Sequence, residues 1–215
     1  MSPARSALAL AFGVGCATAP TVLRAPESAD PRPLAGPSLD PLVPTTLVAE
    51  WRSVRDRLAR EDPLPAAPSE TDGTRALDRT EWPVFARVYL ALAGCDLHAL
   101  ATTDAARAEL RAGATRALTE ALDPRRIGWI HAHFGDPLTD PAATPSAVVH
   151  GAVLYAIERC GDALDDAALG RAGDALHVAF ARAFAARADG VLPSYRGLVW
   201  VTDSLPALAA MALRA

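Results

Sequence analysis

The spacing of apolar residues over 45–215 limits the fold of this chain more than any other feature of its sequence. Apolar residues recur there at steps of three and four, and the first run is Leu47, Val48, Trp51, Val54 and Leu58. Such steps put apolar side chains on one face of an amphipathic helix, whereas a half-buried strand needs strict alternation. No segment alternates convincingly, so the sequence predicts an all-α domain.

Further runs with the same spacing predict about six helices in total. The later helices are expected at residues 80–95, 103–122, 146–160, 165–187 and 203–213. Thr80 is placed to cap the first of these, with Pro83 in its first turn, and Asp165 or Asp166 to start the fourth. Residues 127–144 are rich in aromatic, His, Asp and Pro residues and are expected to form a loop or a broken segment. Consecutive helices fall into pairs, which permits an array of antiparallel helical hairpins.

The composition excludes several classes of protein. A chain of 215 residues, 51% of them hydrophobic, has room for one domain with a sizeable core. The formal net charge is −4, so no nucleic-acid partner is expected. No uninterrupted apolar run reaches the roughly 18 residues of a membrane span. The sequence contains no Gly-rich phosphate loop, no G-x-S-x-G elbow and no H-E-x-x-H motif, and no cofactor is expected.

The amino terminus resembles a bacterial lipoprotein signal. A positively charged start and a short apolar stretch precede the lipobox-like run Gly13-Val14-Gly15-Cys16. Residues 1–15 are therefore expected to be a signal peptide, and Cys16 to be the lipidated first residue of the mature protein. The alternative is cleavage after Ala19, which would release a soluble secreted or periplasmic protein without Cys16.

Residues 16–44 are expected to be a tether. Seven of the residues from 17 to 44 are proline, and such a composition cannot pack a core. Extended as polyproline II, the segment would reach on the order of 85 Å. From a lipidated Cys16 it would hold the domain clear of a lipid bilayer, at the outer membrane or cell surface. A segment without any selected length is the alternative.

Two cysteines fall on apolar helix faces. Cys95 and Cys160 would form a bridge in an oxidising cell envelope, and otherwise they would be buried free thiols. Both alternatives are open at this point.

Three short segments carry a resemblance to known proteins. They are Glu81-Trp82-Pro83-Val84-Phe85, Trp129-Ile130-His131, and Pro193-Ser194-Tyr195-Arg196-Gly197 followed by Trp200 and Asp203. They resemble segments of largely uncharacterised bacterial proteins with an α/α-toroid fold, which are distantly similar to linalool dehydratase-isomerase and to glycoside-processing α/α-barrel enzymes. The predicted helices amount to about half of such a toroid. We therefore expect either a longer reading frame or completion of the ring by a homodimer.

The resemblance implies that the ligand sits at one end of the inner helices, where Glu81 and Asp203 would transfer protons. Each residue also has a structural alternative, because Asp203 could cap its helix and Glu81 could sit in a first turn that favours negative charge. Tyr195, Arg196 and Trp200 combine two aromatic faces with a guanidinium. They would stack on a sugar ring or prenyl chain, hold a carboxylate, or form a packed loop over the helix ends.

His131 is the third candidate for proton transfer, because an unperturbed imidazole titrates near neutral pH. His131 and His133 could approach one another only on an extended backbone, and with Asp136 they would still need further ligands to hold a metal. No other His or Cys stands at ligand spacing, so no metal site is expected. The remaining histidines lie within helical patterns and are expected to pack or face solvent: His98, His150 and His177.

Two functions remain open on the sequence alone. The first is a lipid-anchored envelope enzyme that performs acid–base chemistry on a small sugar-like or terpenoid-like molecule. The second is a non-catalytic helical lipoprotein that binds a partner or serves as a scaffold.

Overall fold

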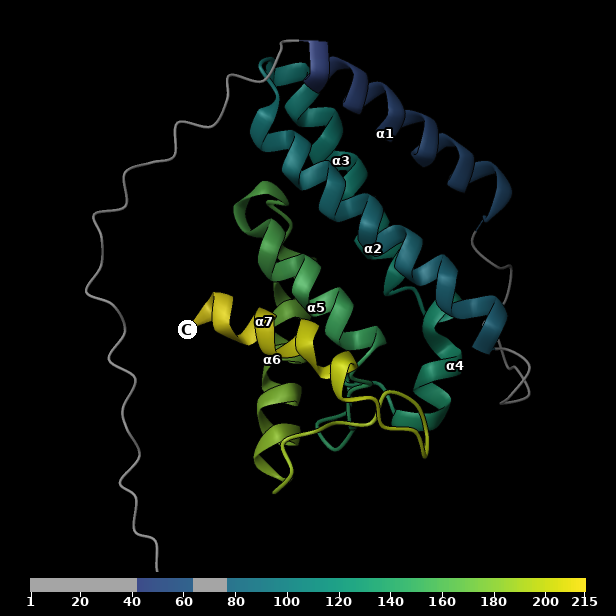
Figure 1. The fold of residues 1–215 in the computed structure, drawn as a ribbon, viewed down its shortest axis with the longest axis vertical. Helices are drawn as coiled ribbons and strands as arrows, with labels where there is room; N and C mark the ends of the chain where they lie inside the picture. The colour runs from purple at the N-terminus through teal and green to yellow at the C-terminus, as the bar shows by residue number, and fades with distance from the viewer. Residues whose placement is uncertain (1–41, 64–76) are drawn as a thin grey trace, which may run out of the picture. The chain divides into compact units, whose positions relative to one another are not determined.

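A computed structural model describes residues 42–63 and 77–215 of the chain. These residues form seven α-helices and two short 3-10 helices without a β-strand, which confirms the all-α fold (Figure 1). The expected signal peptide at residues 1–15, the candidate lipidation residue Cys16 and the tether up to residue 41 lie outside the described residues.

The helices are numbered in chain order. The α-helices are α1 (Leu42–Glu61), α2 (Leu77–Leu100), α3 (Asp104–Ala121), α4 (Pro124–Phe134), α5 (Val149–Cys160), α6 (Ala167–Ala185) and α7 (Leu205–Arg214). The 3-10 helices are η1 (Gly161–Ala163), which follows α5, and η2 (Val201–Ser204), which precedes α7.

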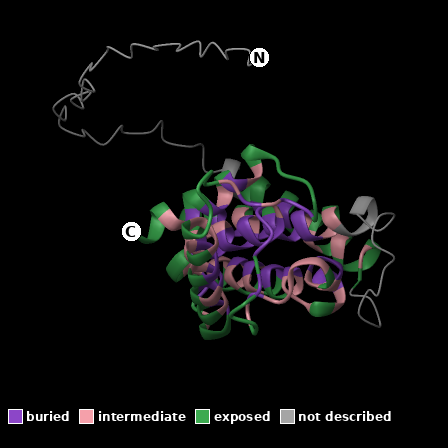
Figure 2. Cartoon of the chain, turned by 90° about the horizontal axis from the view of Figure 1, so that it is seen from below, coloured by how far each residue is buried: buried purple, intermediate pink, exposed green. Residues whose placement is uncertain are grey.

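Helix α2 is the central element of the domain. It forms an antiparallel hairpin with α3 and also contacts α1, α4 and α5, while α7 packs mainly on α5. Figure 2 shows the buried residues gathered between the helices. Within the described residues, one helical segment, Glu81–Leu100 of α2, is long and apolar enough to cross a membrane, with a mean hydropathy of 1.2. Half of that segment is buried, as expected for a core helix.

Helix α4 corrects the expectation of a loop over residues 127–144. Asp123 caps α4, because its Oδ1 accepts a hydrogen bond from the Arg125 N–H at 2.9 Å, and Pro124 occupies the first turn. Ile127 and Ile130 are three residues apart and fully buried. The Asp-Pro pair that ends α3 therefore also begins α4. Residues 135–148 form the irregular connection to α5.

The helix starts agree with the sequence in part. Thr103 caps α3, since its Oγ1 accepts from the Ala106 N–H, and Asp166 caps α6 through two backbone N–H groups. The expected cap at Thr80 is wrong, because α2 already begins at Leu77. Pro83 consequently lies inside the helix rather than in its first turn, and it removes one backbone hydrogen bond there.

Two cross-links tie distant helices together. A disulfide joins Cys95 of α2 to Cys160 of α5, with 5.5 Å between their Cα atoms. Asp62, which follows α1, accepts through Oδ2 from the guanidinium groups of Arg87 at 2.6 Å and Arg126 at 2.8 Å. Both arginines are buried, so this carboxylate compensates two charges that lack contact with water.

Candidate functional site

The candidate residues gather where helix ends meet the segment 190–204 (Figure 1). Just before α5, the hydroxyl of Ser146 donates to the Ser194 carbonyl at 2.7 Å, and the Ala147 N–H donates to the Pro193 carbonyl at 2.9 Å. The Ser194 hydroxyl in turn accepts from the Trp200 N–H at 3.2 Å. These bonds hold the segment against the start of α5.

A tight turn presents Tyr195 inward. The Leu198 N–H donates to the Tyr195 carbonyl at 3.0 Å, and Gly197 has φ +77°, a conformation that an L side chain rarely adopts. Arg196 lies at the exposed tip of this turn. The glycine therefore lets the chain reverse within four residues, which keeps Arg196 outside and Tyr195 buried.

Aromatic rings surround Tyr195. Its ring lies 6.2 Å from that of Trp129 of α4 in a stacked arrangement, and 5.9 Å from that of Trp200 at nearly a right angle. Trp129 and Tyr195 are buried, whereas Trp200 is 53% exposed. The cluster thus has a closed inner side and an edge that is open to solvent.

Two of the acidic candidates act on the Tyr195 hydroxyl. Burial raises the pKa of Tyr195 most, and the Glu81 carboxylate, placed to accept its proton, raises that pKa further. The negative charge of Asp203 adds in the same direction. Glu81 of α2 therefore acts on the Tyr195 hydroxyl although more than a hundred residues separate the two in the chain, and Asp203 of η2 acts on the same hydroxyl.

Several buried polar atoms of this cluster make no well-formed hydrogen bond to any described residue. They are Asp203 Oδ2, the Tyr195 hydroxyl oxygen and the Trp129 indole Nε1. Buried polar groups are nearly always satisfied by protein, water or ligand, because an unpaired one costs about 1–3 kcal/mol. The cluster therefore offers a polar ligand the Asp203 carboxylate as an acceptor, and the Tyr195 hydroxyl and the Trp129 indole N–H as donors.

The structure shows neither Asp203 as a helix cap nor Glu81 in a first turn. Asp203 lies within η2, and neither η2 nor α7 starts with a side-chain cap, so it does not cap a helix. Glu81 is the fifth residue of α2 and lies beyond its first turn.

His131 of α4 faces His150 of α5 rather than the Tyr195 cluster. Their Nε2 atoms are 3.3 Å apart, and the Ser146 N–H donates to His150 Nδ1 at 2.9 Å. Burial lowers the pKa of both residues, that of His150 to about 3, and the charge of Asp136 opposes the shift at His131. Ser146 links this pair to Ser194 and so to the Tyr195 segment.

A metal site is not found among the described residues. No group of three or more His, Cys, Asp or Glu side chains there is arranged to hold an ion. Asp136 Oδ1 lies 3.9 Å from His131 Nε2, but its two oxygens accept from the Leu138 N–H and the Thr139 hydroxyl. His133, two residues along α4 from His131, does not join the pair.

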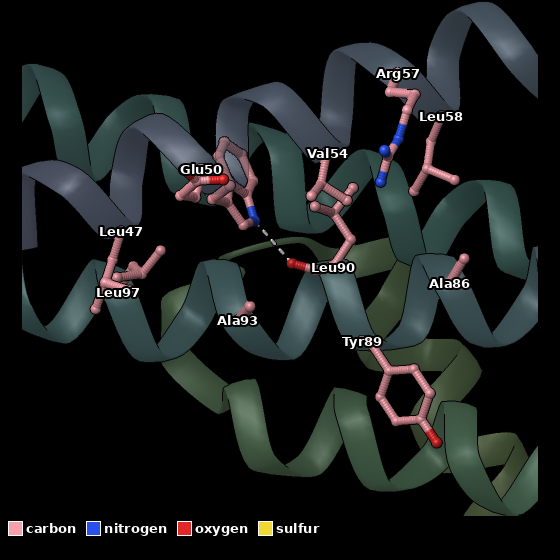
Figure 3. A pocket seen from close by; sticks show the side chains of 11 residues that line it. Leu47, Glu50, Val54, Arg57, Leu58, Ala86, Tyr89, Leu90, Ala93 and Leu97 are labelled. Carbon is pink, nitrogen blue, oxygen red and sulfur yellow. Dashed lines mark hydrogen bonds between the residues drawn. The ribbon is translucent and has the colours of Figure 1, made fainter.

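An apolar groove of about 540 Å³ lies on the other side of α2 (Figure 3). Residues of α1 and α2 line it, among them Leu47, Val54 and Tyr89, with Glu50 and Arg57 as its charged members. The indole of Trp51 donates to the Leu90 carbonyl at its floor at 2.9 Å. The groove shares no lining residue with the Tyr195 cluster.

The sequence did not identify two residues of the site. The burial of His150 agrees with the expectation that it packs or faces solvent, but the sequence does not predict its pairing with His131. Trp129 was noted only as part of a short motif. No periodic signal distinguishes either residue, because a buried partner and a core residue have the same spacing on a helix.

Comparison with protein-family models, with curated proteins and with solved structures finds no match to this chain.

Proposed function

We propose that this protein is a cell-envelope lipoprotein whose α/α-toroid-like domain performs acid–base chemistry on a small sugar-like or terpenoid-like molecule. The proposal is supported by the effect of the Glu81 and Asp203 carboxylates, which both raise the pKa of the buried Tyr195 hydroxyl. It is also supported by Asp203 Oδ2 and the Tyr195 hydroxyl oxygen, which are buried without a well-formed hydrogen bond to any described residue. Paired carboxylates beside a hydrogen-bond donor are what proton transfer to and from a bound ligand requires.

The proposed roles follow from the chemistry of each group. Like an ordinary tyrosine, Tyr195 is protonated at neutral pH, and burial raises its pKa further. In the proposal its hydroxyl donates a hydrogen bond to a ligand oxygen. Glu81 and Asp203 accept or return the proton that moves. The exposed Trp200 covers one face of the ligand, and Arg196 binds a polar substituent from the tip of its turn.

The proposed location in the cell envelope rests on separate support. The lipobox-like run before Cys16 favours lipid attachment, and the Cys95–Cys160 disulfide fits an oxidising compartment. The alternative of a soluble secreted or periplasmic protein agrees equally with the disulfide. Completion of a ring by a homodimer remains part of the toroid proposal.

A ligand screen followed by matched variants tests the proposal. The full chain is incubated with monosaccharides, polyols and prenyl alcohols, and its thermal stability and the turnover of each compound are measured. For a compound that is turned over, Glu81→Gln, Asp203→Asn and Tyr195→Phe are each expected to lower turnover about 100-fold while the melting temperature is maintained. Glu50→Gln, which alters a carboxylate of the α1–α2 groove, is the control and should leave turnover unchanged.

The outcomes separate the two functions. A compound that raises the melting temperature of the wild type, loses this effect in Asp203→Asn and is never turned over would favour the non-catalytic binding module. Turnover that survives all three substitutions would contradict the proposed site.

A further inference from the structure

His131 of α4 and His150 of α5 contact each other, and their contacts determine which ring nitrogen of each residue carries the proton. We infer that His150 holds His131 in the tautomer that carries its proton on Nδ1, so that His131 presents a neutral N–H donor to solvent and to any ligand bound there. His150 is then a positioning residue. The inference follows from two contacts and from the exposure of His131, each of which removes one alternative.

The first contact assigns the tautomer of His150. The backbone N–H of Ser146 donates to His150 Nδ1 at 2.9 Å, so this nitrogen must carry a lone pair. A neutral imidazole has one N–H group and one acceptor nitrogen. The proton of His150 therefore resides on Nε2.

The second contact transfers that assignment to His131. The two Nε2 atoms are 3.3 Å apart and the ring planes differ by only 8°. The ring centroids are 5.4 Å apart. This distance exceeds the distance between the two Nε2 atoms by about two ring radii, so the two Nε2 atoms lie between the centroids. The rings therefore lie edge to edge rather than face to face. His150 Nε2–H thus donates to His131 Nε2, and the proton of His131 must lie on Nδ1.

The third observation concerns the free side of His131. Nδ1 of His131 has no hydrogen-bond partner among the described residues, and it is not among the polar atoms that are buried without one. The His131 side chain is 15% exposed. The Nδ1–H group therefore faces solvent. His150 and Ser146 lie behind it and are buried.

The same geometry keeps the pair neutral. Protonation of His131 would place two N–H groups against each other at the Nε2 contact, and burial opposes a charge on either ring. A charged group also lies beside the pair: Asp136, whose Oδ1 is 3.9 Å from His131 Nε2. That distance is longer than a hydrogen bond, and the Asp136 oxygens accept from Leu138 and Thr139, so Asp136 does not replace His150 as the partner of His131.

The assignment changes the chemistry available to His131. Its Nε2 lone pair is occupied by His150, so it cannot act as a base through that nitrogen, and a neutral Nδ1–H is a hydrogen-bond donor rather than a strong acid. A neutral donor of this kind suits a ligand oxygen such as a hydroxyl, ether or carbonyl. This use toward a ligand rests on the proposed function, whereas the tautomer does not.

Long-range ¹H–¹⁵N NMR of histidine-labelled full-length protein tests the inference without any substrate. The signals are assigned from His131→Phe and His150→Phe. In the wild type we expect His131 to show a protonated Nδ1 and an unprotonated Nε2, and His150 the reverse, from pH 8 down to pH 5. His150→Phe should let His131 occupy both tautomers and raise its pKa toward the ordinary value.

Two further variants distinguish positioning from packing. His150→Gln retains an N–H donor in reach of His131 and should preserve the Nδ1–H tautomer, while His133→Phe on the same helix should change neither residue. An Nε2–H signal for His131 in the wild type would overturn the inference even if His150→Phe fails to fold. So would a His131 tautomer and pKa that are unchanged in a folded His150→Phe protein.

Discussion

At the scale of single residues, Trp51 sets how closely α1 approaches the α2–α3 hairpin. Its indole Nε1 donates to the Leu90 carbonyl at 2.9 Å, and the guanidinium of Arg55 lies 5.2 Å from the ring. The ring occupies space beside Gly94 and Gly113, where a Cβ atom would be in close contact with it. Large and small residues thus fit one another at this helix crossing.

Gly113→Ala is expected to destabilise the protein, although alanine favours helices. A Cβ at Gly113 would lie 2.7 Å from Trp51 Cζ2, and relieving that overlap costs about 1–3 kcal/mol, more than the gain in helix propensity. The control is Gly170→Ala in α6, where no atom lies within 4 Å, and it should stabilise by about 0.5–1 kcal/mol. Urea denaturation of both variants measures the difference, and a stabilised Gly113→Ala would contradict the packing described.

At the scale of elements, α1 is attached to the domain at its end as well as through Trp51. The Asp62 carboxylate pairs with Arg87 of α2 and Arg126 of α4, and the Asp62 carbonyl accepts from the Arg87 guanidinium. Arg87 also pairs with Glu120 of α3 at 2.8 Å. Four helices therefore meet at one polar network, which includes the helix that the sequence did not predict.

Asp62→Ala is expected to lower the free energy of unfolding by about 3 kcal/mol, because it leaves buried guanidinium charge uncompensated. Asp56→Ala removes an exposed partner of Arg55 and should change stability by no more than about 0.5 kcal/mol. Equilibrium unfolding in urea compares the two variants. Equal effects would mean that the network is not stabilising α1.

At the scale of the whole molecule, the segment 190–204 lies at one end of the helices. Elements that are distant in sequence meet there. The Cys95–Cys160 disulfide ties α2 to the end of α5, and near its start α5 meets α4 through His150 and His131. The same packing buries His150 as a neutral ring. Burial of a titratable group in its neutral form makes the stability of the entire fold depend on pH.

The free energy of unfolding is expected to fall as the pH is lowered from 7 to 5. The pKa of His150 is about 3 in the folded protein and about 6.5 when unfolded, so between these values only the unfolded state takes up the proton. This residue alone should cost about 2 kcal/mol between pH 7 and pH 5, and His131 shifts in the same direction. Above pH 7 the contribution is constant.

Urea denaturation at pH 5, 6 and 7 measures this slope. The pKa of Glu109, lowered to about 2 beside Arg52 and Arg55, lies below this window in the folded protein. His150→Phe should lose most of the pH dependence, whereas His133→Phe should keep it. The same slope in His150→Phe and in the wild type would refute the assignment.

Local signals in the sequence determined most of the helices. The spacing of apolar residues defined the all-α class, and Thr103 and Asp166 cap the helices that begin after them. These features are local because helix periodicity and caps depend on residues only a few positions apart. The same locality explains the error at α4, since an Asp-Pro pair directly after the helix expected at 103–122 is compatible with the end of one helix and with the start of the next.

The tertiary structure alone decided which polar side chains meet. The sequence could name Glu81, Asp203 and His131 as candidates, but it could not place the first two at one tyrosine hydroxyl and the third against His150. The pairing of Glu81 with Tyr195 and that of His131 with His150 join elements that are distant in the chain, so they depend on how whole helices pack. Burial then determines the protonation of the groups that meet, and neither packing nor burial can be deduced from the spacing of residues along the chain.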